Sequence, residues 1–135
     1  MKKKTASKIR KKPFEDDTDP AVLSAYRKML AAVPGVEWKG AARPYTSLNG
    51  NMYSAISKAD IIGLRLSAAD REIFLEKYGN GLYEPFPGFF QKEYVAIPEK
   101  LLANTRTLRS WFRKSYEHVA SLKPKPTKKP KNNPR

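Results

Sequence analysis

The sequence predicts an α+β domain in which an antiparallel sheet is flanked by helices, with the element order α-β-β-β-α-β-α. Two stretches, one near residue 20 and one after residue 104, carry apolar residues at helical spacing. Between residues 36 and 66 the apolar period changes to two, and Asn49-Gly50 separates two alternating runs, as is typical of a β-hairpin. The 135 residues leave room for one domain.

The first helix is expected to begin at Asp19-Pro20, because an acid can cap a helix and a proline presets its first turn. Pro34-Gly35 ends the apolar run, which predicts a helix of about 14 residues. Its apolar side consists of Val22, Leu23, Tyr26, Met29, Leu30 and Val33.

Residues 36–66 are expected to form three or four antiparallel strands. Alternating runs at 36–39, 45–48, 52–56 and 61–66 are separated by residues that favour turns. Asn49 and Gly50 both tolerate the positive φ angles of a type I′ turn, so a hairpin is expected there.

A second helix is expected after Ser67, since Asp70 follows three residues later in a weak capping box and glycines follow the helix at 79 and 81. Pro85 and Pro87 make residues 82–90 a poor candidate for a central strand. Strand character returns at residues 92–97.

The last helix is expected to begin at Asn104. One apolar stripe follows along it, consisting of Leu108, Trp111, Phe112, Ser115, Val119 and Leu122. Five aromatic residues at strand and helix spacing are expected in the core rather than stacked on bases: Trp38, Tyr53, Tyr94, Trp111 and Phe112. The glycines Gly40, Gly63 and Gly81 are expected at strand bends or a helix end.

Five stretches share their order and spacing with a known family: Pro-Gly-Val-Glu at 34–37, the hairpin at 45–53, Leu-Arg-Leu-Ser at 64–67, Lys-Glu-Tyr-Val-Ala-Ile-Pro at 92–98, and the closing aromatic helix. Over about residues 21–122 the chain resembles the N-terminal domain of the TfoX (Sxy) family. The resemblance implies a sheet-and-helices domain of the kind also seen in secretion chaperones, without a catalytic site. Most small stand-alone members of that family have no assigned molecular function.

The net charge of +14 is concentrated at the two ends of the chain. Residues 1–14 hold seven Lys or Arg and residues 123–135 hold six, without an acid in either segment. All thirteen acids and the other fourteen basic residues lie within 15–122, so that segment is nearly neutral. We therefore expect a disordered basic arm at 1–18, a folded domain at 19–122 and a disordered Lys/Pro-rich tail at 123–135.

The sequence offers little for catalysis or metal binding. It has no cysteine and one histidine, His118, which lies about 100° around the predicted helix from Glu117 and so forms no oriented pair with it. Glu72 and Glu76 are interpreted as a solvated helix face, and the acidic run at 15–19 as helix-start acids or a partner for the basic arms. We expect no enzyme activity, no cofactor and no metal.

Nucleic acid is the partner that the basic ends favour, because Lys and Arg that neutralise phosphates release bound counterions. The alternative is that the tails only aid solubility. Contacts from the tail are expected from Lys123, Lys125, Lys128, Lys129 and Lys131. On the folded domain, cations near aromatic residues of the predicted sheet are Lys39, Arg43, Arg65 and Lys92.

The sequence thus predicts a non-enzymatic macromolecule-binding or regulatory module whose cationic arms have nonspecific affinity for DNA or RNA. The alternative is a protein–protein adaptor or homodimer that uses the sheet or the terminal helix, with the arms incidental. The start Met-Lys-Lys-Lys is not followed by an apolar stretch, and no window has the roughly 18 apolar residues of a membrane helix. We expect a cytoplasmic protein without membrane contact.

Overall fold

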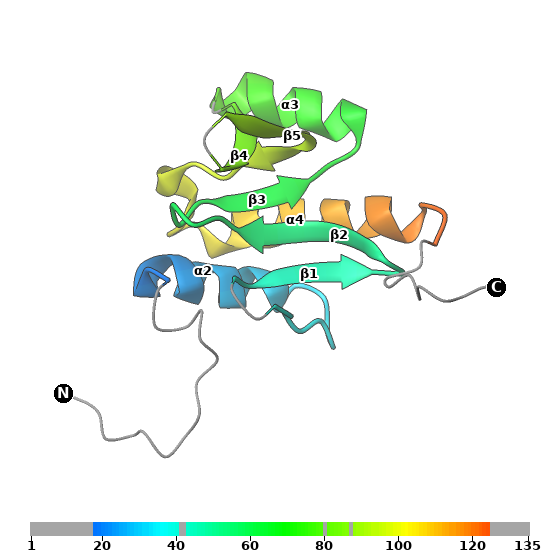
Figure 1. Cartoon of the computed structure of the whole chain (residues 1–135), viewed down its shortest axis with the longest axis horizontal. Coiled ribbons are helices and arrows are strands. Elements are labelled where there is room, and N and C mark those ends of the chain that lie inside the picture. The colour runs from blue at the N-terminus through cyan, green and yellow to red at the C-terminus, as the bar shows by residue number, and fades with distance from the viewer. Residues whose placement is uncertain (1–17, 41–42, 80, 87, 125–135) are drawn as a thin grey trace, which may run out of the picture.

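The structure, a computed structural model, describes residues 18–40, 43–79, 81–86 and 88–124. It confirms the α+β class: five antiparallel strands form one sheet in the order β1-β2-β3-β5-β4 (Figure 1). Along the chain the elements are α2 (Pro20–Leu30), β1 (Tyr45–Leu48), β2 (Asn51–Ile56), β3 (Ile62–Arg65), α3 (Ala68–Tyr78), β4 (Leu82–Phe86), β5 (Phe89–Ala96), the 3₁₀ turn η2 (Glu99–Leu101) and α4 (Thr105–Ala120).

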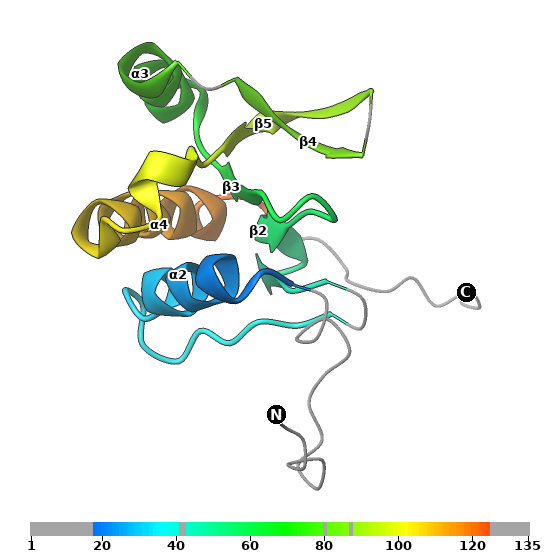
Figure 2. The ribbon, with the colours of Figure 1, turned by 90° about the vertical axis from the view of Figure 1, so that its left-hand side faces the viewer.

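The three α-helices lie on one face of the sheet (Figure 2). Helix α4 contacts β1, β2 and β3, α2 packs beside α4, and α3 contacts β5. No helix in the described part of the chain covers the opposite face. We call this opposite face the open face. The predicted disorder of the two ends concerns mainly residues 1–17 and 125–135, which lie outside the described residues.

The helix boundaries follow from capping side chains. The Asp19 carboxylate accepts a hydrogen bond from the Ala21 N–H at 2.9 Å, and the Ser67 hydroxyl accepts one from the Asp70 N–H at 3.2 Å. Asn104 caps α4 in the same way by accepting from Thr107. All three helix starts therefore confirm the sequence-based expectation.

One expected strand is not observed. Residues 36–39 were expected to form a strand, but only Lys39 pairs, through one bridge to Tyr45. The Trp38 side chain faces α2 instead. Its ring lies 5.8 Å from the Tyr26 ring, and the Arg27 guanidinium lies over the Trp38 ring. The alternation at 36–39 thus reflects packing of a loop against a helix.

The predicted order lacked β4, and this was wrong. Leu82–Phe86 pairs with β5 despite Pro85. The strand lies at the edge of the sheet, where a residue without an N–H costs no hydrogen bond on the outer side. The expectation that residues 82–90 do not form a central strand is confirmed for this edge strand, whereas Phe89 and Phe90 begin β5, which lies between β3 and β4.

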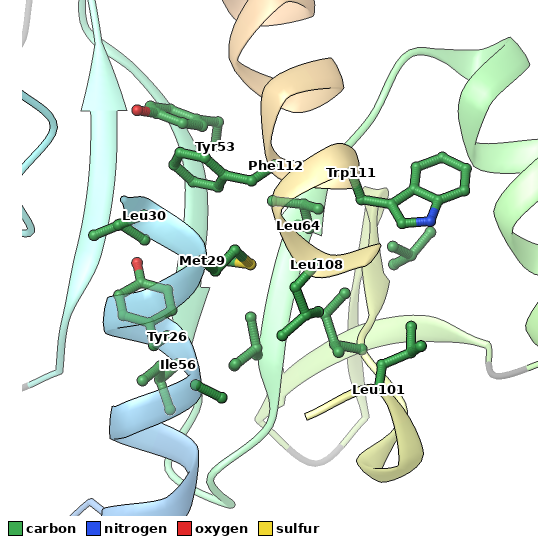
Figure 3. Packing of buried hydrophobic residues seen from close by; sticks show 14 of the residues in the cluster. Tyr26, Met29, Leu30, Tyr53, Ile56, Leu64, Leu101, Leu108, Trp111 and Phe112 are labelled. Carbon is green, nitrogen blue, oxygen red and sulfur yellow. The ribbon is translucent and has the colours of Figure 1, made fainter. Parts of the chain in front are cut away.

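The hydrophobic core fills the space between the helices and the sheet (Figure 3). Phe112 from α4 is fully buried, 5.5 Å from the Tyr53 ring of β2, and Trp111 meets Phe74 of α3 edge to face at 5.0 Å. The core placement of Tyr53, Trp111 and Phe112 is confirmed, and Trp38 packs against the cluster partly buried. Tyr94 is buried on the other side of the sheet, which leads to the open face.

Candidate functional site

The open face owes its composition to an irregularity between β1 and β2. Their register shifts between Thr46 and Ser47, so that β2 carries one unpaired extra residue. Tyr53 and Ser54 consequently both point toward the helices, Tyr53 into the core and Ser54 to the Tyr26 hydroxyl at 2.7 Å. Met52 and Ala55 are left on the open face.

A close aromatic contact shapes the middle of this face. Gly63 in the central strand β3 would place a Cβ atom only 2.5 Å from three atoms of the Tyr83 ring, so the ring occupies the space of the missing side chain. Tyr83 is 2% exposed, and its ring lies 5.9 Å from that of Tyr94. The Tyr94 hydroxyl donates to the Met52 carbonyl at 2.8 Å. These contacts hold the β4–β5 hairpin against strands β2 and β3.

A groove of about 540 Å³ runs between this hairpin and strands β1 and β2. We call it the hairpin groove. Its size falls within the roughly 300–1,000 Å³ of clefts that hold small ligands. Its lining is mainly apolar and aromatic and includes two cations, Arg43 and Lys58. The residues that line it are Arg43, Pro44, Tyr45, Met52, Ala55, Ile56, Ser57, Lys58, Tyr83, Pro85, Phe89 and Gln91.

A second, more polar groove of about 530 Å³ adjoins the first, since Met52 and Gln91 line both. We call it the edge groove. It is lined by Gly50, Asn51, Met52, Arg65, Phe90, Gln91, Lys92, Glu93 and Tyr94. Phe89 and Phe90, which line one groove each, are 49% and 51% exposed. Neighbouring side chains of a strand point to opposite sides, which is why these two phenylalanines line different grooves.

The structure brings three of the four predicted cations of the folded domain to these grooves. Arg43 lines the hairpin groove, and Arg65 and Lys92 line the edge groove. Lys39 lines neither, and its ammonium donates to the Ser47 hydroxyl at 2.9 Å. Among the predicted tail contacts, Lys125, Lys128, Lys129 and Lys131 lie outside the described residues.

The two arginines have structural partners. Arg65 pairs with Glu93 at 2.8 Å and donates to the Met52 carbonyl at 3.2 Å, which ties β3 to both neighbouring strands. Arg43 lies 3.7 Å from Asp60 and donates to the Lys58 carbonyl at 3.4 Å. Of these groove cations, Lys58 and Lys92 are the exposed ones.

Both ends of the described chain leave the domain beside the grooves. Arg43 of the hairpin groove donates to the hydroxyl of Thr18, the first described residue, at 3.1 Å. Asn51 of the edge groove donates its side-chain amide to the carbonyl of Lys123 at 3.2 Å. The described chain therefore begins and ends in contact with two residues that line the grooves, Arg43 and Asn51.

The other sequence candidates lie elsewhere. His118 is half-buried on α4, with its carbonyl accepting a hydrogen bond from Ser121, and Glu72 and Glu76 are exposed on α3. Asp19 caps α2, and the remaining acids of the run at 15–19 precede the described residues. Within 18–40, 43–79, 81–86 and 88–124, no three His, Cys, Asp or Glu residues gather as they would around a metal ion.

Sequence reasoning missed the hairpin residues that line the grooves. The missed residues lie within 82–90, a stretch whose prolines make it a poor candidate for a central strand. They are Tyr83, Pro85, Phe89 and Phe90. Four of the nine residues at 82–90 are aromatic, whereas aromatic residues make up 11% of the whole chain. This enrichment was the signal that could have identified them. The lining supplies aromatic and apolar surface flanked by positive charge, which suits flat or apolar groups that carry negative charge.

The buried tyrosines predict a loss of stability at alkaline pH. Burial raises the pKa of Tyr83 from 10.0 to about 12, and it also raises the pKa of Tyr94. The unfolded chain releases these protons near pH 10 while the folded chain retains them, so the free energy of unfolding should fall as the pH rises from 10 toward 12. Thermal unfolding followed by circular dichroism from neutral pH to pH 12 measures this. The Tyr83→Phe variant should lose stability less steeply, and identical slopes would contradict the prediction.

Comparison of the chain with protein-family models, with curated proteins and with solved structures finds no match. Among the described residues, none of the helices combines the length and the apolar character that crossing a membrane requires.

Proposed function

We propose that this chain is a non-enzymatic, cytoplasmic binding module of the TfoX N-terminal type that associates with nucleic acid across the open face of its sheet. In this proposal the basic segments 1–14 and 123–135 supply affinity for phosphates, and the domain supplies the surface against which the bound strand lies. The observation that carries it is the departure of both ends of the described chain from groove residues, at Thr18–Arg43 and at Lys123–Asn51.

The distribution of charge supports the same proposal. Thirteen Lys and Arg residues belong to segments that continue from the two grooves, while residues 15–122 are nearly neutral. Each phosphate that a Lys or Arg neutralises releases counterions, which gives sequence-independent affinity that weakens as salt rises.

Neutralising the basic segments should weaken nucleic-acid binding. In a full-length variant, the thirteen Lys and Arg residues of 1–14 and 123–135 are replaced by glutamine. At low salt its affinity for mixed-sequence DNA and RNA should fall at least about tenfold, and the slope of log affinity against log salt should shrink by about 0.9 for each lost phosphate contact. Fluorescence anisotropy titrations at several salt concentrations measure both quantities.

A matched control keeps the ends and removes charge from the helix side of the domain. Lys77 and Lys100, which are both exposed and lie near the Tyr78 ring, are replaced by glutamine. This variant should bind with nearly the affinity and salt dependence of the unaltered protein. Equal binding by the variant with neutral ends would contradict the proposal.

A protein–protein adaptor or homodimer is the second candidate, and the exposed rings of Phe89 and Phe90 favour it. Association through such apolar surface should persist at high salt, whereas association bridged by nucleic acid should dissolve. Sedimentation at low and high salt, with and without nuclease treatment, separates the two candidates.

A further inference from the structure

We infer that the two grooves of the open face take unpaired bases, so that the nucleic acid this protein prefers is single-stranded. This inference rests on the proposed function and specifies the ligand of the same face. It is carried by the combination, in two adjoining grooves, of exposed aromatic rings and flanking cations, and by sheet edges that are interrupted at Tyr45 and Pro85.

The aromatic rings are placed where an extruded base could stack. Phe89 stands in the hairpin wall of the hairpin groove, which Tyr45 also lines from β1, and Phe90 stands in the edge groove. About half of each phenylalanine side chain is exposed. Stacking between a base and an aromatic ring is tolerant of sequence, because every base presents a flat π surface. A duplex keeps its bases inside the stack and cannot offer those surfaces.

The charges of the groove lining favour a polyanion. The lining contains four cations, Arg43, Lys58, Arg65 and Lys92, and one acid, Glu93, which is paired with Arg65. Asp60 beside Arg43 offsets one further charge, so the lining of the two grooves taken together remains positive. Lys58 and Lys92 are exposed, one along each groove. Phosphates that connect two stacked bases would lie near these ammonium groups.

The edges of the sheet argue against a peptide that pairs as an additional strand. The outer edge of β1 already exchanges two backbone hydrogen bonds with Lys39, at 2.7 and 3.0 Å through Tyr45. At the opposite edge, β4 contains Pro85, which has no N–H to donate. The grooves of the open face instead offer rings and cations, rather than backbone groups, to a ligand.

The test compares four probes on the full-length protein: single-stranded oligo-dA and oligo-U of about 12 nucleotides, an abasic strand with the same number of phosphates, and a duplex. Oligo-dA and oligo-U should bind more tightly than the abasic strand. Phe89→Leu and Phe90→Leu keep apolar volume but remove the ring. Each should weaken single-strand binding about 5- to 100-fold and leave duplex and abasic binding unchanged. Phe89→Trp should retain the preference.

Ile73→Ala is the matched control, since Ile73 is 53% exposed on α3, away from the grooves, and its replacement should change no affinity. Equal affinity of the unaltered protein for base-containing and abasic strands, with salt-dependent binding intact, would overturn the inference and leave the proposed function standing. Absence of binding to every probe at low salt would overturn both. A third outcome is that the protein shows no preference for single strands but self-associates, and that Phe89→Leu or Phe90→Leu abolishes this self-association. That outcome would overturn the inference and assign the grooves to a second copy of the chain.

Discussion

Replacing Phe112 by alanine should lower the free energy of unfolding by about 3–5 kcal/mol, because the ring is fully buried at the centre of the core. The ring packs 5.5 Å from the Tyr53 ring, and its removal leaves a cavity between α4 and the sheet that surrounding side chains fill only in part. Urea denaturation followed by circular dichroism measures the change.

The control for this substitution removes the same ring from the surface. Phe90→Ala deletes a phenylalanine that is 51% exposed and should cost well under half as much. A midpoint shift of equal size in both variants would contradict the packing described here. Unchanged slopes of unfolding free energy against urea would show that both effects come from stability rather than from a change in the exposed surface.

Gly63→Ala should destabilise the domain by about 1–3 kcal/mol although it adds a single methyl group. Its Cβ atom would lie 2.5 Å from the Tyr83 ring, and those ring atoms are close to the backbone, so the hairpin itself must move. Each kcal/mol lost should lower the melting temperature by about 4–8 °C. The same displacement should open the hairpin groove, because Tyr83 lines it.

A double-mutant cycle shows whether the ring is the cause. In the Tyr83→Ala background the space above Gly63 is empty, so adding Gly63→Ala should cost at least about 1 kcal/mol less than it does in the unaltered protein. Additive effects of the two substitutions would mean that the penalty of Gly63→Ala arises elsewhere in the strand.

Local chemistry explains what the sequence could predict. Asn49 and Gly50 have φ angles of 53° and 82°, as the type I′ hairpin turn requires, and the helix starts follow from side chains within three residues of each cap. The apolar stripe of α4 predicted the buried residues Leu108, Phe112 and Val119, since periodicity identifies the face of a helix that must be buried.

The site could not be predicted in the same way, because it arises from contacts between distant segments. Nothing local to Gly63 indicates that the Tyr83 ring, twenty positions later, will fill the space beside it. The prolines of the hairpin argued against a strand, yet they are compatible with the edge position that only the sheet order defines. The arginines expected at a ligand surface proved to be held by Glu93 and Asp60.

The hydrogen bond between Asn51 and Lys123 has a consequence for avidity. An extended chain spans at most about 3.6 Å per residue, so the seven residues that follow Pro124, which include four lysines, can span at most about 25 Å from that contact. In the proposed function, a strand held in the groove would meet these lysines at a high effective concentration instead of by a second diffusional encounter. Two individually weak modes of attachment, tethered in this way, would reinforce each other multiplicatively on any strand long enough to reach both.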